Sequence, residues 1–224
     1  MFLLPSNICE PVERAMNGFL WKPGTRENSG IMWMAWQKGC VRKQDGGLGF
    51  QGLHHFNIVM LAKTRWNRLT RPEALVSKLF QARYYHKYDF YMRNKANRSF
   101  LWRDLCAEKR ILKQGYLRRI GNVKTTRVYV DPWILKENLS YVESSSFIGS
   151  ESFIVADLMK QGVKGCDLDL LRAFFNKVDM EVARQILLNI RPRRDTWMWK
   201  LDNKGLYSVK SGYHLLYNQN ITPN

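Results

Sequence analysis

The sequence predicts a mainly helical α+β protein, with a helical first part, a β-hairpin and a smaller α+β part after it. Apolar residues recur at three- and four-residue steps over several stretches, which is the spacing of one helix face. Short runs of β-branched and aromatic residues near 117–130 and 196–209 indicate strands. With 45% hydrophobic and 13% aromatic residues, the 224-residue chain has enough apolar surface to bury a core.

The first two helices are expected at the N-terminal end of the chain. One begins at residues 5–7, and its apolar side carries Ile8, Val12, Ala15, Met16, Phe19 and Leu20. Trp33 and Trp36 lie three residues apart, so one face of a second helix would present both. Core packing of these rings is favoured over stacking on nucleic-acid bases.

A glycine-rich turn over 43–50 should lead into the strongest helix. Gly46, Gly47 and Gly49 permit positive φ angles or close backbone packing, and Leu48 and Phe50 anchor the turn. In the helix that follows, one stripe holds Phe56, Val59, Ala62, Trp66 and Leu69, and the opposite side holds Asn57, Thr64 and Arg68.

Further elements follow in order along the chain. A helix opens after Pro72 with Leu75 and Leu79 on its apolar side, and another runs from Ser99 to Gln114 and is closed by Gly115. Residues 117–120 and 127–130 should pair as a hairpin about a turn at 121–122. Two short helices are expected at about 168–175 and 179–188, then strands at 196–200 and 206–209 about a 203–205 turn, then a helix over 209–217.

The composition divides these elements into regions. Residues 1–137 form a helical region that ends in the hairpin, and the serine-rich, charge-balanced residues 138–151 form a linker. Residues 152–217 form a small α+β region, and 218–224 form a polar tail.

The positive charge is large and unevenly distributed. The net charge is +17, and residues 1–120 hold 22 Lys+Arg against 8 Asp+Glu. Residues 83–119 alone hold 11 cations against 3 acids, with aromatic side chains between them. This pattern favours binding to the backbone of RNA or DNA, because cations displace counterions from phosphates and rings stack on bases. The alternative is a solvated basic face over ordinary core aromatics. The candidate phosphate contacts are Arg83, Lys87, Arg93, Lys95, Arg98, Arg103, Lys109, Arg110, Lys113, Arg118 and Arg119.

Catalytic, metal and membrane functions find no support in the sequence. The four cysteines, at positions 9, 40, 106 and 166, are too dispersed for a zinc site and are typical of reduced thiols inside the cell. Asp131 is isolated, so we expect a turn role for it, and no nucleophile with a base can be placed. We therefore expect no catalytic residue, metal, cofactor or small-molecule substrate. No signal peptide or membrane span is visible, which predicts a soluble protein without a membrane partner.

Many short motifs in one order resemble a known family. The motif residues, expected to be structural, are Trp33, Trp36, Gly46, Gly47, Leu48, Gly49, Phe50, Phe56, Asn57, Lys63, Trp66, Trp102, Arg103, Gly121, Asp131, Trp133, Tyr207, Ser208 and Tyr213. In these motifs the chain is similar to plant LINE-type (non-LTR) retrotransposon reverse transcriptases, in the thumb and connection region downstream of the polymerase palm and just upstream of the zinc-binding region. The resemblance covers nearly the whole chain.

The resemblance implies a part that lacks the family's catalytic centre. The palm with its Tyr-x-Asp-Asp motif would precede Met1, the zinc ligands would lie beyond Asn224, and no Asp-Asp pair occurs in the chain. We expect a non-enzymatic fragment of an RNA-directed DNA polymerase that binds RNA or DNA, in the nucleus by family resemblance or in an organelle. The alternatives are a decayed remnant with a structural or interaction role and a residual reverse transcriptase completed by a separate palm. Residues 191–194, with the sequence Arg-Pro-Arg-Arg, stand where the family has Pro-Leu-Ser after Ile190, and this departure indicates relaxed constraint.

Overall fold

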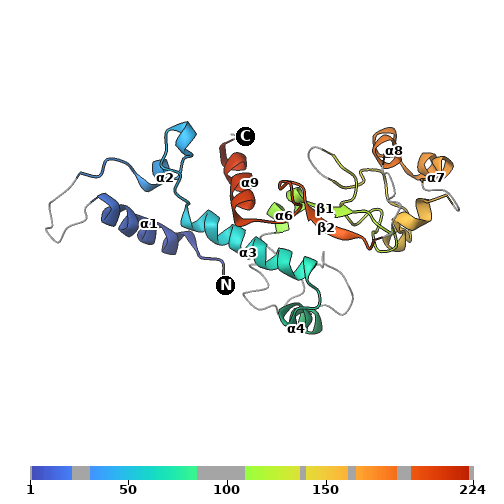
Figure 1. The fold of residues 1–224 in the computed structure, drawn as a ribbon, viewed down its shortest axis with the longest axis horizontal. Helices are drawn as coiled ribbons and strands as arrows, with labels where there is room; N and C mark the ends of the chain where they lie inside the picture. The colour runs from blue at the N-terminus through green and yellow to red at the C-terminus, as the bar shows by residue number, and fades with distance from the viewer. Residues whose placement is uncertain are drawn as a thin grey trace. The chain divides into compact units, whose positions relative to one another are not determined.

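The computed structural model describes residues 2–21, 31–84, 109–136, 140–160, 165–185 and 193–221 (Figure 1). The chain forms two compact units, each assembled from separate stretches of sequence. Unit 1 comprises residues 1–65, 84–111 and 208–224, and unit 2 comprises residues 66–83 and 112–207. The expected domain bounds, with a linker at 138–151, stay a prediction. Within that segment, Ser140 and Ser150 are buried, and Ser144 bonds Asp179 of unit 2.

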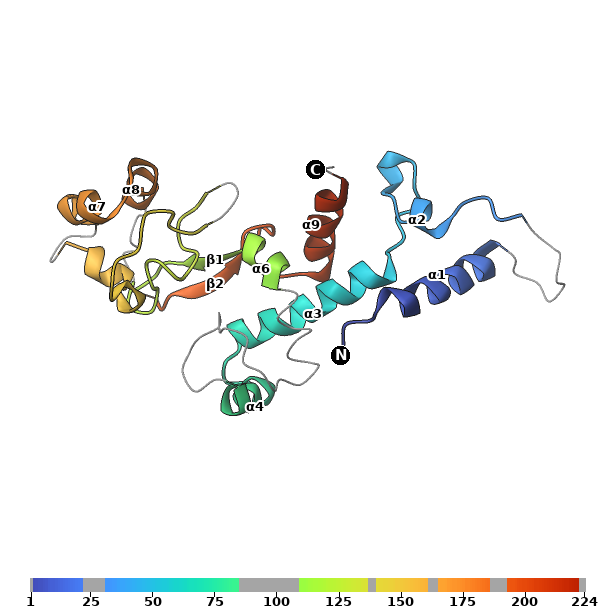
Figure 2. The same cartoon turned by 180° about the vertical axis from the view of Figure 1, so that it is seen from behind.

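Helices dominate the part of the chain that is described, and the expected α+β, mainly helical fold class is confirmed. They are α1 (Ser6–Trp21), α2 (Trp36–Gly39), α3 (Leu53–Thr70), α4 (Leu75–Tyr84), α6 (Lys109–Gly115), α7 (Leu168–Phe174), α8 (Lys177–Arg184) and α9 (Val209–Ile221). Single 3-10 turns lie at Lys43–Asp45, Ser150–Ser152 and Val155–Leu158. The strands β1 (Tyr116–Arg119) and β2 (Thr196–Trp199) form one antiparallel pair, seen from behind in Figure 2.

The strand pairing differs from the expected local hairpin. β1 pairs with β2, with Arg119 opposite Thr196, whereas the expected partner segment 127–130 contributes a single bridge from Arg127 to Ile154. Residues 121–126 do not turn back along β1, because Asp195 accepts hydrogen bonds from their backbone and side chains. The second expected pairing, of 196–200 with 206–209, is also wrong. Gly205, at φ +69°, only returns its carbonyl to the amide of Trp199.

The glycine turn before α3 has the geometry that its sequence predicts. Gly46 and Gly49 have φ angles of +87° and +73°, a region that favours glycine. A Cβ on Gly47 would lie 2.1 Å from the carbonyl oxygen of Val41, so this position admits no side chain. Phe50 donates its backbone N–H to Gly39 and stacks on Trp36 with the ring centroids 5.0 Å apart.

Two side-chain placements correct the sequence-based expectations, and one set agrees with them. Trp33 lies outside α2 and is 76% exposed, so it shares no helical face with Trp36. Asn57 is buried rather than on a wet side of α3, because its side chain bonds the backbone of Leu4 and Phe2. The expected stripe with Val59, Ala62 and Trp66 is buried as predicted.

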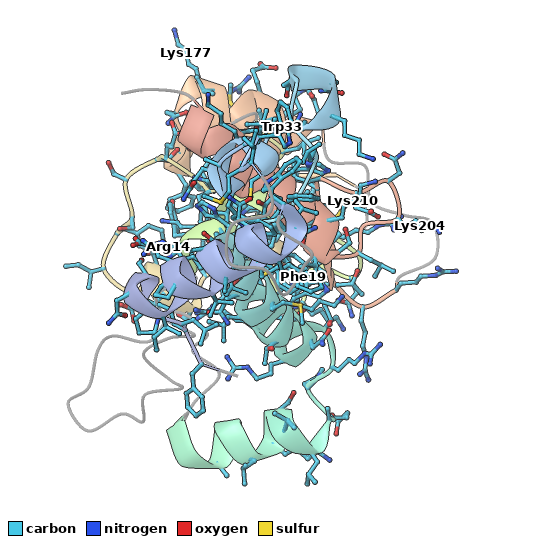
Figure 3. The ribbon with its side chains drawn as sticks, turned by 90° about the vertical axis from the view of Figure 1, so that its left-hand side faces the viewer. Arg14, Phe19, Trp33, Lys177, Lys204 and Lys210 are labelled. Atoms are coloured by element: carbon cyan, nitrogen blue, oxygen red, sulfur yellow. The ribbon has the colours of Figure 1, made fainter. Side chains whose placement is uncertain are left out.

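The apolar side of α1 exists but faces outward in unit 1. Cys9 and Asn17 form the buried side of this helix. The exposed apolar side chains are Ile8, Val12, Met16, Phe19 and Leu20, with Phe19 labelled in Figure 3. On α4, Leu75, Val76 and Leu79 are likewise exposed.

Unit 2 has two apolar centres. One contains Val128, Trp133, Ile134, Val155, Leu158, Leu171, Phe175 and Ala183, between the 126–158 segment and helices α7 and α8. In it, the Trp133 indole donates to the carbonyl of Val128 at 2.8 Å, and Asp131 accepts from the amide of Arg127, which confirms the turn role expected for Asp131. The other is an aromatic cluster in which Trp199 meets Trp66 and Tyr207 at centroid distances of 6.1 and 4.8 Å.

Candidate nucleic-acid interface

The structure describes only part of the predicted cationic site. Arg83, Lys109 and Arg110 belong to α4 and α6, but their side chains are not among those described. Five predicted contacts lie outside the described residues altogether: Lys87, Arg93, Lys95, Arg98 and Arg103. The motif residue Trp102 lies outside as well. Three predicted contacts, Lys113, Arg118 and Arg119, have described side chains in unit 2.

These three side chains differ in what they offer to a phosphate. The Arg118 guanidinium is half-buried, lies 4.7 Å from the centroid of the Trp197 ring and donates to the Thr125 hydroxyl at 2.9 Å. It therefore helps to hold β1 against β2. Lys113 is exposed, with its ammonium 5.1 Å from the Tyr141 ring centroid, and Arg119 is exposed at the end of β1.

A basic patch gathers where β1 ends and β2 begins. We call Arg119, Lys124, Arg193 and Arg194 the strand-end patch, and all four are exposed. The pairing of Arg119 with Thr196 brings the two segments together. The two segments approach closely at Gly121, where a side chain would not fit because its Cβ would lie 2.1 Å from the carbonyl oxygen of Arg193. No ion pair of these four cations is found within the described part of the chain.

Asp195 lies beneath this patch and organises its backbone. Its Oδ1 accepts from the amides of Gly121 and Val123 at 2.7 and 3.0 Å, and its Oδ2 accepts from Thr125 and from the Thr126 hydroxyl. Burial opposes ionisation of Asp195, but these hydrogen bonds outweigh it and lower the pKa of the carboxyl. Since the carboxylate is buried and bonded, it is not available to pair with the exposed arginines.

This arrangement can hold a polyanion. Arginine and lysine side chains form charge-assisted hydrogen bonds to phosphate, and an exposed group of them without acidic partners favours phosphate contact. No group of three or more His, Cys, Asp or Glu residues that could hold a metal occurs among the described residues.

Arg193, Arg194 and Lys124 are the members of the patch that are not among the phosphate contacts predicted from the sequence. The sequence presents residues 191–194 only as a departure from the family motif. The signal that could have found the two arginines is the run of three arginines within 191–194, just before the strand that begins at Thr196. Lys124 was missed because a single lysine in a turn carries no pattern.

The described motif residues are mostly structural. In unit 1, the hydroxyl of Tyr213 on α9 accepts the amide N–H of Gly52 at 2.9 Å, at the start of α3. Ser208 caps α9 through Ser211. Phe56 and Lys63 are half-buried on α3, and Tyr207 is buried in the aromatic cluster of unit 2.

Comparison with known proteins connects the chain to plant proteins. No protein-family model matches it, and no solved structure does. An uncharacterized mitochondrial protein of Arabidopsis thaliana is 36% identical over 138 residues, which cover 61% of this chain and 89% of that protein. The chain belongs to the family of that mitochondrial protein.

A second relative extends the similarity to almost the whole chain. A putative ribonuclease H protein of Arabidopsis thaliana is 24% identical over 220 residues, or 96% of this chain. The chain spans 35% of the length of this relative. Together the two relatives support a plant retroelement-derived protein. Within the described residues, no helix is both long and apolar enough to cross a membrane.

Proposed function

We propose that the chain is a non-catalytic part of a retrotransposon-type RNA-directed DNA polymerase that binds the backbone of RNA or DNA without sequence preference. The strand-end patch carries this proposal. It places four exposed cations from two distant segments around one buried, fully bonded carboxylate, on a chain with a net charge of +17. Its geometry suits phosphates rather than base edges, since the cations are not set in a groove-reading helix.

Three further observations support the proposal. The longer relative is named a putative ribonuclease H protein, and a segment that binds nucleic acid is consistent with that name. The absence of an Asp-Asp pair from the sequence argues against polymerisation by this chain itself, because two-metal chemistry needs clustered carboxylates. One relative is named a mitochondrial protein, which supports an organelle as the place of action beside the nucleus expected from the motifs.

The experiment is a binding titration at several salt concentrations. Fluorescent single-stranded RNA, single-stranded DNA and duplex DNA, each in two unrelated sequences, would be titrated with the full chain. Affinity should be nearly equal for the two sequences of each type, and log K should fall by about 0.7 to 0.9 per phosphate neutralised as log salt rises.

The same titration distinguishes a site from diffuse attraction. Replacing Arg93, Lys95, Arg98 and Arg103 by Ala tests the part of the predicted site that is not described. The matched control replaces Arg172, Lys177, Arg184 and Lys204, four exposed cations away from it in the sequence; Lys177 and Lys204 are labelled in Figure 3. Equal loss of affinity in both variants would mean that residues 93–103 contribute only diffuse charge and form no site of their own.

A further inference from the structure

Unit 1 contains a cavity that the proposed function does not use. Its volume is about 330 Å³, at the lower end of the range of about 300–1,000 Å³ for small-molecule sites. It is open to solvent on one side and is lined by α1, the 36–40 segment, the start of α3 and α9. The described lining residues are Ser6, Cys9, Glu10, Glu13, Trp36, Gln37, Cys40, Gly52, His54, His55, Tyr213 and Tyr217.

Aromatic rings held by their neighbours form much of the wall. Trp36 is stacked on Phe50, with an interplanar angle of 26°. The ring of Tyr213 meets His55 edge-on at 6.4 Å, and Tyr217 is held by the Arg42 guanidinium at 5.1 Å from its centroid. Because these contacts fix the rings before any ligand arrives, little side-chain entropy would be lost on binding.

The charged groups in the wall are acidic. Glu10 and Glu13 line the cavity, and no lysine or arginine does so among the described residues. Glu13 Oε1 accepts the amide N–H of Leu53, which leaves Oε2 for a ligand. Burial and the Glu13 carboxylate raise the pKa of the Cys40 thiol to about 11, and burial lowers the pKa of His55. The cavity is therefore a negative site on a strongly basic protein.

We propose that this cavity binds an organic cation, namely a quaternary or alkyl ammonium group. Aromatic rings attract such cations, and a quaternary ammonium gives up its weak hydration easily. Glu10 and Glu13 complement the positive charge of the ligand. The same carboxylates repel phosphates, so this site is separate from nucleic-acid binding. Sequence patterns did not indicate it, because the lining comes from separate segments.

The test compares choline with 3,3-dimethyl-1-butanol, which has the same shape but a carbon in place of the charged nitrogen. Both would be titrated into the full chain by calorimetry. Choline should bind at least about tenfold more tightly than the neutral isostere. Glu10→Gln should weaken choline binding about three- to tenfold, and Trp36→Leu should weaken it further. Glu73→Gln, at an exposed acid of unit 2, is the matched control and should change nothing.

The outcomes separate the sources of the cation and can overturn the site. A trimethyllysine peptide that binds more tightly than choline would identify a protein side chain as the ligand, and the reverse order would identify a free small molecule. Equal affinity for choline and its isostere, equal losses in Glu10→Gln and Glu73→Gln, or no binding of either cation would each refute the proposal. Glu10 is exposed, so its variant should fold, and thermal denaturation checks this.

Discussion

Because Gly115 packs against Trp199, we expect an alanine at position 115 to lower the free energy of unfolding, which is the opposite of the usual effect in a helix. In most helices Gly→Ala stabilises by about 0.5–1 kcal/mol, because the unfolded chain loses conformational freedom. Here a Cβ would lie 2.2 Å from the six-membered ring of Trp199, far inside the roughly 3.5–4.0 Å of a normal carbon contact. Trp199 is fully buried against Trp66 and Tyr207, so it cannot move aside freely. We expect Gly115→Ala to destabilise by about 1–3 kcal/mol.

Urea denaturation followed by circular dichroism measures this effect, and two further variants sharpen it. Gly18→Ala, on α1, meets nothing within 4 Å and should be neutral or stabilising. Trp199→Phe by itself should lower the free energy of unfolding. The double variant, which also carries Gly115→Ala, should lose about 1 kcal/mol less than the sum of the two single losses, because the smaller phenylalanine ring leaves room for the added methyl group. A stabilised Gly115→Ala, or strictly additive effects, would refute the proposed packing.

Three other predictions follow from the structure and sequence. Asp195→Asn should destabilise by roughly 2–4 kcal/mol at neutral pH, because an amide cannot accept all the hydrogen bonds of the carboxylate. The pKa of Asp195 is lower in the folded protein than in the unfolded chain, so its contribution to the free energy of unfolding is present above the unfolded pKa and is lost as the pH falls through the folded pKa. Denaturation of both proteins at neutral pH and below about pH 4 checks this. A stability difference between them that does not change with pH would contradict it. Purified chain with magnesium or manganese should extend no primer, and chelator-sensitive incorporation would show a hidden catalytic centre. Elemental analysis should find less than about one zinc per chain, whereas stoichiometric zinc would reveal a Cys/His site.

Local features of the fold were predictable from the sequence. The periodicity of α3 and the glycine turn before it depend on residues within a few positions, and the structure has both. The end of α6 at Gly115 and helices α7, α8 and α9 follow from the same kind of signal. The burial of Asn57 escaped prediction, because its partners at Leu4 and Phe2 come from a distant segment.

Pairing between distant segments was not predictable. Strands at β1 and β2 are predicted by the sequence, but the Gly-Asn turn after β1 favours a local partner. β1 pairs with β2 instead, because Asp195 accepts hydrogen bonds from residues 121–126. The candidate site has the same origin. Arg119 was expected as a phosphate contact from local charge, whereas Arg193 joins it only through the β1–β2 pairing and the close approach at Gly121. A single sequence contains no sign of that approach.

The salt dependence of nucleic-acid binding by two matched quadruple variants distinguishes phosphate contacts at the strand-end patch from diffuse attraction. One replaces the strand-end patch, Arg119, Lys124, Arg193 and Arg194, by Ala, and the other replaces Arg172, Lys177, Arg184 and Lys204. If the patch contacts phosphates, the slope of log K against log salt should decrease by about 2–4 units for the first variant and by less than about 1 for the second. Equal changes in both slopes, or a patch variant that binds like the unmodified chain, would contradict the account.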